Sequence, residues 1–132
     1  IERYALWENS AGAGRYRGGL GVVRDYRILG DDILVSLSSE RQHVTAHGAC
    51  GGMPGTAGAF VMNPGLPDEQ KLPSAAADVP LPRGSVLSIR TPGGGGFGQV
   101  EQRDPQQIER DAREERISVQ HAKGVYRWHT PA

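Results

Sequence analysis

A glycine-rich run near residue 95 has the spacing of a nucleotide-binding motif. Gly93, Gly95 and Gly98 match the pattern Gly-x-Gly-x-x-Gly, and the run follows a stretch that is expected to form a strand. A dinucleotide-binding loop must open directly into a helix, whose N-terminal amides face the pyrophosphate. Here Pro105 and a separate helix start follow the run, and no glycine cluster ends in Gly-Lys-Ser/Thr. We therefore expect this segment to bind no nucleotide or other cofactor.

Two histidines and the single cysteine raise the question of a metal site or a nucleophile. His43 and His47 are four residues apart, a spacing that places two imidazoles on one face of a helix. They lie in a glycine-rich loop without a neighbouring Glu, and Cys50 adds one ligand at irregular spacing. Cys50 has only His47 nearby as a base, so a small buried thiol is the favoured interpretation. We expect no metal ligand and no catalytic residue here.

A basic cluster with interleaved tyrosines could bind a phosphate or a carboxylate; it consists of Arg15, Arg17, Arg24 and Arg27, with Tyr16 and Tyr26. Arg24 and Arg27 fall on an expected strand whose outward face must be polar in any case, which favours solvated or paired side chains. Arg17 lies next to glycines and is the exception. It is the arginine that we select as a ligand candidate.

Strands and loops must position these groups. Aromatic, β-branched and alternating apolar residues predict strands over residues 3–7, 22–29, 33–38, 59–62 and 85–90. The turn residues Gly30, Asp31 and Asp32 between two of these strands predict an antiparallel hairpin near the N-terminus. Five prolines within residues 63–84 predict an extended connector in that region.

The tail changes character and is expected to be helical. Asp104, Pro105 and Gln107 form a favourable helix start for a helix over about 105–116, with its charge run on a solvated face. Ser118 is expected to cap a second short helix that Gly124 ends. The predicted fold class is mainly β with a short C-terminal helical tail (α+β): a β-rich segment over 1–98 with Gly/Pro-rich loops and a tail over 99–132, together one incomplete domain of a larger subunit.

Composition excludes several classes of function. Fifteen basic and fifteen acidic residues give a net charge of zero, so no global field attracts nucleic acid or an anionic membrane. No apolar run approaches the roughly 18 residues of a membrane helix. A single cysteine favours a reducing compartment, and we expect the cytoplasm. The chain begins at Ile1 without a Met, from which we expect a fragment or a processed product.

Several glycine-rich motifs occur in a fixed order along the chain: Glu8–Arg24, Gly51–Gly55, Asn63–Gly65, Leu72–Ser74, Thr91–Gly98 and Glu101–Pro105. This order resembles the C-terminal segment of a hydantoinase B/oxoprolinase family subunit (N-methylhydantoinase B type). Ala11 stands where the family pattern has Gly, Ala75 where a Lys commonly follows Pro-Ser, and the loop 43–50 lacks a Pro-Trp-Gly-like stretch. These departures concern local loops.

The resemblance implies part of an ATP-dependent hydrolase that opens a cyclic amide of the hydantoin or 5-oxoproline class. The alternatives are part of a related ATP-dependent ketone carboxylase, or a non-catalytic binding or structural module. The resemblance also implies ATP and a divalent metal in the complete enzyme. Its implied partners are the remainder of the same subunit and an ATP-binding hydantoinase A-type subunit, in an oligomer.

The resemblance carries over no catalytic residue, because the family's His- and Asp-bearing motifs belong to an N-terminal part that these residues do not match. We therefore expect the segment alone to be inactive, with a structural and interface role. Candidates for loops beside the substrate are the residues of the two glycine clusters and the adjacent arginine: Arg17, Gly18, Gly19, Gly93, Gly94, Gly95 and Gly96.

Overall fold

The computed structural model describes residues 1–129, which form seven strands and three short helices. The strands are β1 (Arg3–Leu6), β2 (Val22–Arg27), β3 (Ile33–Ser38), β4 (Ala59–Met62), β5 (Gln70–Leu72), β6 (Ala75–Leu81) and β7 (Val86–Arg90). The helices are the 3-10 helix η1 (Val100–Gln102), α1 (Pro105–Arg113) and α2 (Val119–Val125). The predicted fold class, mainly β with a short C-terminal helical tail, is confirmed.

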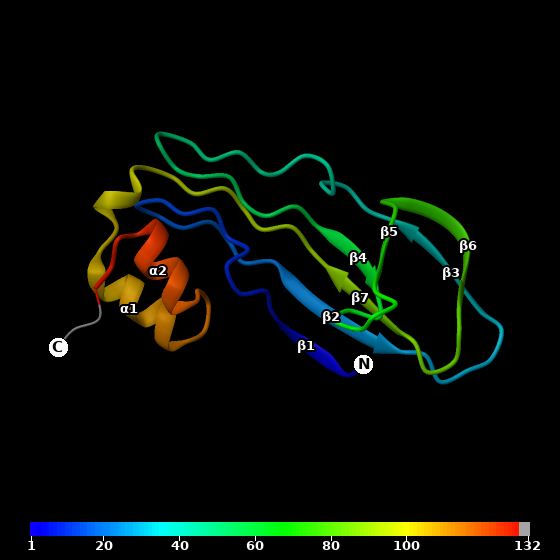
Figure 1. Cartoon of the computed structure of the whole chain (residues 1–132). Coiled ribbons are helices and arrows are strands. Elements are labelled where there is room, and N and C mark those ends of the chain that lie inside the picture. Colours follow the sequence, from blue (N-terminus) through cyan, green and yellow to red (C-terminus); the bar gives the residue numbers. More distant parts are fainter. Residues whose placement is uncertain (130–132) are drawn as a thin grey trace.

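The strands form two sheets at one end of the molecule, and α1 and α2 lie at the other end (Figure 1). The larger sheet has the order β1-β2-β7-β4-β5, and every neighbouring pair in it is antiparallel. The smaller sheet pairs β3 with β6, also antiparallel, with an irregular register between Val35 and Leu37. Long extended segments join the sheets to the helices (Figure 1).

The hairpin predicted between residues 22–29 and 33–38 is wrong. β2 lies between β1 and β7, so both of its hydrogen-bonding edges are occupied within the larger sheet. β3 instead crosses to the smaller sheet and pairs with β6. The turn at Asp32, which has a φ of 55°, redirects the chain between sheets rather than folding it back on itself.

The connector predicted over residues 63–84 contains two strands, β5 and β6. β6 includes Pro80, which lacks an N–H group and is excluded from the middle of most sheets. It is accommodated because a strand of a two-stranded sheet has one free edge. The proline count alone could not reveal this arrangement.

The two sheets are held together by an apolar cluster of buried side chains: Leu37, Phe60, Leu72, Leu81 and Leu87. They come from β3, β4, β5, β6 and β7, so both sheets contribute. Complete burial of each such side chain contributes roughly 1.5–3 kcal/mol. This cluster fixes the position of β7, from which the central glycine-rich run continues.

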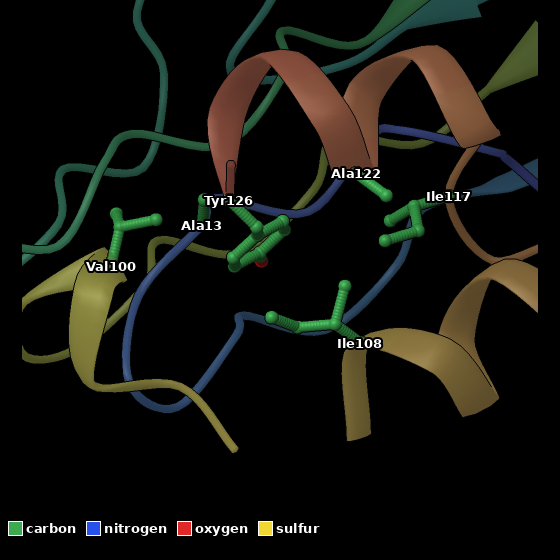
Figure 2. Close-up of a cluster of buried hydrophobic side chains, with 6 residues drawn as sticks. All are labelled: Ala13, Val100, Ile108, Ile117, Ala122 and Tyr126. Atoms are coloured by element: carbon green, nitrogen blue, oxygen red, sulfur yellow. The ribbon is translucent and has the colours of Figure 1, made fainter. Parts of the chain in front are cut away.

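The helical tail packs through a second cluster, formed by Ala13, Val100, Ile108, Ile117, Ala122 and Tyr126 (Figure 2). The Tyr126 ring lies among the other five side chains, and this burial raises the pKa of its hydroxyl. Ala13 belongs to the first glycine-rich segment. The cluster therefore docks the tail onto the end of that segment.

The predicted helix starts are confirmed. The Asp104 carboxylate accepts from the Gln106 N–H at 2.9 Å, and the Ser118 hydroxyl accepts from the His121 N–H at 3.1 Å. The ends differ: α1 stops at Arg113, and Gly124 lies inside α2 rather than after it. Within residues 1–129, no helix has the length and apolar character needed to span a membrane.

Candidate functional site: a bundle of glycine-rich segments and its arginine clamp

Five extended segments pack side by side between the larger sheet and the helices, and we call them the glycine bundle. They comprise residues 10–14, 16–21, 46–49, 52–58 and 91–98. The last of these, the continuation of β7, is central, because its backbone hydrogen-bonds to each of the other four. Figure 1 shows these segments as long ribbons running toward α1 and α2.

The central segment does not follow β-strand geometry, in which side chains alternate between two faces. Every third amide donates to the same neighbouring segment. Gly93 and Gly96 donate to the carbonyls of Thr56 (3.0 Å) and Met53 (2.9 Å), and Gly94 and Phe97 donate to those of Gly19 and Tyr16 (both 2.9 Å). A backbone with about three residues per turn is the polyproline II form, which makes no internal hydrogen bonds. Here neighbouring segments satisfy the backbone instead.

Glycine is required in this bundle because there is no room for a side chain. A Cβ atom on Gly93, Gly95 or Gly96 would overlap the backbone of Ser10, His47 or Ala13 respectively. None of these three glycines has a positive φ, so backbone conformation does not explain them. Close approach of main chains is therefore the reason for the run.

One glycine of the bundle, Gly19, has open space beside it, and Gly94 is the least crowded of Gly93 to Gly96. A Cβ on Gly19 would meet nothing within 4 Å, and one on Gly94 would come no closer than 3.1 Å to the Gly19 nitrogen. Gly18, by contrast, abuts the Gly94 backbone. The structure thus brings together the two glycine clusters that were selected from the sequence, at a position where part of their backbone is accessible.

The bundle does not fit a phosphate cradle. The amides of Gly93, Gly94 and Gly96 donate to carbonyl groups of neighbouring segments, so they are not available to an anion. A nucleotide loop would also require a helix directly after the run. Instead, η1 begins at Val100, has three residues and is preceded by Gln99 without a side-chain cap.

Arg17 is held by the protein rather than directed into open space. Its Nε and Nη2 atoms donate to the two carboxylate oxygens of Asp111 at 3.0 and 3.2 Å, and its Nη1 donates to the Gly18 carbonyl at 3.0 Å. Arg103 donates from Nη2 to the same carboxylate at 2.7 Å. We call Arg17, Arg103 and Asp111 the arginine clamp; it joins the glycine bundle to α1.

The clamp is a buried ionic cluster. The Asp111 side chain is 4% exposed, and those of Arg17 and Arg103 are 14% and 6% exposed. Burial alone would raise the pKa of Asp111, but hydrogen bonds from Arg17 and Arg103 outweigh it and hold the pKa below its usual value. Asp111 is therefore ionised at neutral pH, and both arginines depend on its charge.

Asp111 was missed by the interpretation of the helix as a solvated charge run. The exposed pair Arg110 and Glu114 fits that interpretation, with Nε and Oε1 3.0 Å apart. Asp111 lies three residues after the buried Ile108 and therefore on the inward face. That spacing was the available signal.

The other arginines of the basic cluster also have partners within the chain. Arg24 donates to the Tyr4 hydroxyl at 3.4 Å, and Arg27 forms a bidentate pair with Glu2. The Arg15 guanidinium lies 5.4 Å from the centre of the Tyr16 ring. The cluster is spread over the surface and does not form one pocket.

The loop between β3 and β4 carries His43, His47 and Cys50, all of which are exposed. The expected burial of the Cys50 thiol is therefore wrong. The segment 46–49 contributes its backbone to the glycine bundle, which leaves these side chains outside. Among residues 1–129, no three His, Cys, Asp or Glu side chains gather closely enough to hold a metal ion.

Comparison with known proteins shows which family shares this sequence and fold. A model of the hydantoinase B/oxoprolinase family matches residues 1–100. An uncharacterised protein of Methanocaldococcus jannaschii is 38% identical over 128 residues, covering 96% of this chain and 22% of that protein. 5-oxoprolinase 1 of Arabidopsis thaliana is 36% identical over 99 residues, covering 74% of this chain and 8% of that protein.

Two solved structures share the fold. The ATP-dependent caprolactamase from Pseudomonas jessenii gives a TM-score of 0.78 at 20% identity, over 96% of this chain and 22% of the other. Nucleotide-free acetone carboxylase gives the same score and identity, over 93% and 20%. The chain thus spans about a fifth of these proteins and of the archaeal relative. From the family match and these identities, the chain belongs to the hydantoinase B/oxoprolinase family.

Proposed function

We propose that the chain is the C-terminal part of a subunit that opens a cyclic amide of the hydantoin or 5-oxoproline class with ATP. Within that subunit it is a scaffold and an interface, and residues outside the chain perform catalysis. The observation that carries this proposal is the central segment of the glycine bundle, residues 91–98, whose backbone hydrogen-bonds to neighbouring segments and which carries no ionisable side chain.

ATP and a divalent metal belong to the complete enzyme in this proposal. An ATP-binding hydantoinase A-type subunit supplies the nucleotide site, and the remainder of the same subunit supplies the metal ligands. The engaged amides of the glycine run support this assignment, and so does the finding that no three possible metal ligands gather within residues 1–129. The single cysteine favours the cytoplasm for the assembly.

A lactam or hydantoin is favoured over a ketone because of sequence similarity. The relatives named 5-oxoprolinase are 32–36% identical to this chain, whereas acetone carboxylase is 20% identical. ATP-dependent carboxylation of a ketone is the second candidate, and the shared fold with acetone carboxylase supports it.

The test uses the complete product of the gene, purified with its ATP-binding subunit. We expect ATP-dependent opening of 5-oxoproline or hydantoin with release of ADP, and no bicarbonate-dependent consumption of acetone. Acetone carboxylation without ring opening would establish the second candidate instead. If the two subunits form a complex that transforms neither substrate, the third candidate, a non-catalytic module, would be favoured.

The accessible edge of the glycine bundle is proposed as one wall of the active site. Of the seven candidates named from the sequence, Gly19 has open space beside it, and Arg17 donates from Nη1 to the Gly18 carbonyl. Gly19→Val should raise KM severalfold with an unchanged melting temperature, because the added atoms enter open space. Gly124→Ala, equally free of neighbours but on α2, is the matched control. Equal KM values in the two variants would show that this edge of the bundle does not line the active site.

A further inference from the structure

A groove beside the glycine bundle is lined by basic side chains around an apolar floor, and we call it the cationic groove. It has a volume of about 510 Å³, and its lining includes Trp7, His43, Ala59, Val61, Lys71 and Arg90. Phe60 and Ile89 pack toward the smaller sheet. Because side chains alternate along a strand, Val61 of β4 and Arg90 of β7 project from the opposite face of the larger sheet.

The register of the larger sheet sets the shape of the groove. Ala59 pairs with Arg90 of β7, and Val61 pairs with Lys71 of β5. The two cations therefore stand on opposite sides of β4, at different heights along it. Between them the floor is apolar, and Val61 is only 2% exposed.

The charge of the groove is one-sided. Its described lining contains two permanent cations and a histidine, Lys71, Arg90 and His43, and includes neither Asp nor Glu. The whole sequence carries equal numbers of acidic and basic residues, so composition does not explain this bias. Within residues 1–129, neither Lys71 nor Arg90 takes part in an ion pair.

Arg90 is positioned for an anion. Its Nε donates to the Ser88 hydroxyl at 3.3 Å, and Ser88 is fully buried. Its guanidinium carbon lies 5.8 Å from the centre of the Trp7 ring. These two contacts restrain the side chain, and a planar guanidinium matches the geometry of a carboxylate. The Trp7 ring adds a flat apolar surface beside the cation.

We propose that the cationic groove binds a small organic carboxylate with a flat apolar body. The carboxylate pairs with Arg90, the body lies over Ala59 and Val61, and Lys71 adds attraction from the far side. The volume falls within the roughly 300–1,000 Å³ typical of small-molecule sites, which favours a small ligand over a protein segment. The site does not rest on the activity proposed above, because binding is measured without turnover.

The test measures binding of para-fluorobenzoate to the complete gene product by fluorine NMR, with the neutral para-fluorobenzamide as the matched ligand. We expect saturable binding of the acid with a Kd on the order of 1 mM or tighter. The amide should bind at least about tenfold more weakly, because it cannot form the charge-assisted contact with Arg90.

Variants locate the binding. Arg90→Gln and Lys71→Gln should each weaken binding of the acid by about tenfold. Arg24→Gln, which removes an exposed arginine that stacks on Tyr4, should leave it unchanged. Ala59→Phe should abolish it by filling the floor. If Ala59→Phe does not fold, Lys71→Gln still decides, because Lys71 is exposed and its replacement leaves the core intact.

Equal affinity for acid and amide, equal loss in Arg24→Gln and Arg90→Gln, or no binding up to about 10 mM would overturn the proposal. Binding of an acidic peptide that depends on Arg90, with no binding of the small acid, would also overturn it and assign the groove to a protein segment.

Discussion

At the residue scale, one buried carboxylate determines how the helical tail meets the glycine bundle. Asp111 receives two hydrogen bonds from Arg17 and one from Arg103, at distances of 2.7–3.2 Å. Arg103 also donates to the Arg15 carbonyl, so the clamp includes a hydrogen bond to the backbone in addition to its ion pairs. Removal of one member of such a cluster leaves the others buried without compensation.

Asp111→Asn should destabilise the docking of α1 by about 3 kcal/mol, because two buried guanidinium groups lose their counter-charge. Hydrogen exchange of the complete gene product, followed in peptides from residues 10–21 and 104–113, measures this loss. Glu114→Gln is the control: its ion pairs with Arg110 and Arg116 lie at the surface, so the exchange of both peptides should stay close to that of the wild type. Equal exchange in the two variants would contradict a structural role for the clamp.

The clamp also predicts a pH dependence. The folded pKa of Asp111 lies below its usual value, so the unfolded chain binds a proton more readily. The stability that it contributes is complete above the unfolded pKa of about 3.9 and is lost as the pH falls through the lower folded value. Exchange rates corrected for their intrinsic pH dependence should rise below about pH 4 in the wild-type protein. If Asp111→Asn shows the same rise, another group is responsible.

Residue-scale features were predictable where they are local. The caps at Asp104 and Ser118 follow from side chains and amides within three residues of one another. Asp111 and Arg17 are separated by 94 positions in the sequence. The pairing of Arg17 depends on tertiary structure, so the sequence could select the residue but could not name its partner.

At the element scale, the glycine bundle replaces a sheet by extended chains with about three residues per turn. A signal for it exists in the sequence: Gly52, Gly55 and Gly58 are spaced by three, and Gly93 and Gly96 share that spacing. A Cβ on Gly52 or Gly55 would overlap the central segment. Glycine repeats with this period predict packed extended chains, whereas the sequence analysis predicted Gly/Pro-rich loops in these segments.

Gly96→Val should destabilise the bundle by at least about 2 kcal/mol, because its Cβ would overlap the Ala13 backbone. Gly94→Ala is the comparison within the same run and should cost less stability than Gly96→Val, because its Cβ would come no closer than 3.1 Å to the Gly19 nitrogen. Gly30→Val should also be mild, since its Cβ meets only the end of the Ile33 side chain, 3.0 Å away. Exchange of the Tyr16 and Phe97 peptides distinguishes these variants. Equal tolerance at all three sites would make the run a mere spacer.

Strand positions were predictable, and strand partners were not. Alternating or β-branched residues located β3 and β4 to the residue, because that pattern is local. The partner of β3 is β6, which lies 37 or more positions along the chain and contains a proline. Its selection depends on the apolar cluster between the two sheets rather than on the turn that follows β2.

At the scale of the whole molecule, the chain spans about a fifth of its archaeal relative and of the two solved structures. Large apolar side chains are exposed in separate places, including Tyr4, Leu6, Tyr16 and Phe97. We expect the 132-residue chain to self-associate when produced alone, because these surfaces have no cover. Analytical ultracentrifugation at increasing concentration measures this, and a strictly monomeric chain with a sharp thermal transition would identify an independent module.

The central claim is that this chain is a scaffold and that other parts of the assembly perform the chemistry. The most direct measurement is ADP release dependent on 5-oxoproline or hydantoin, by the 132-residue chain alone and by the complete gene product with the ATP-binding subunit proposed above. We predict no release above background in the first sample and robust release in the second. Sustained turnover by the 132 residues alone would contradict the claim and place catalytic groups among the residues assigned here to packing.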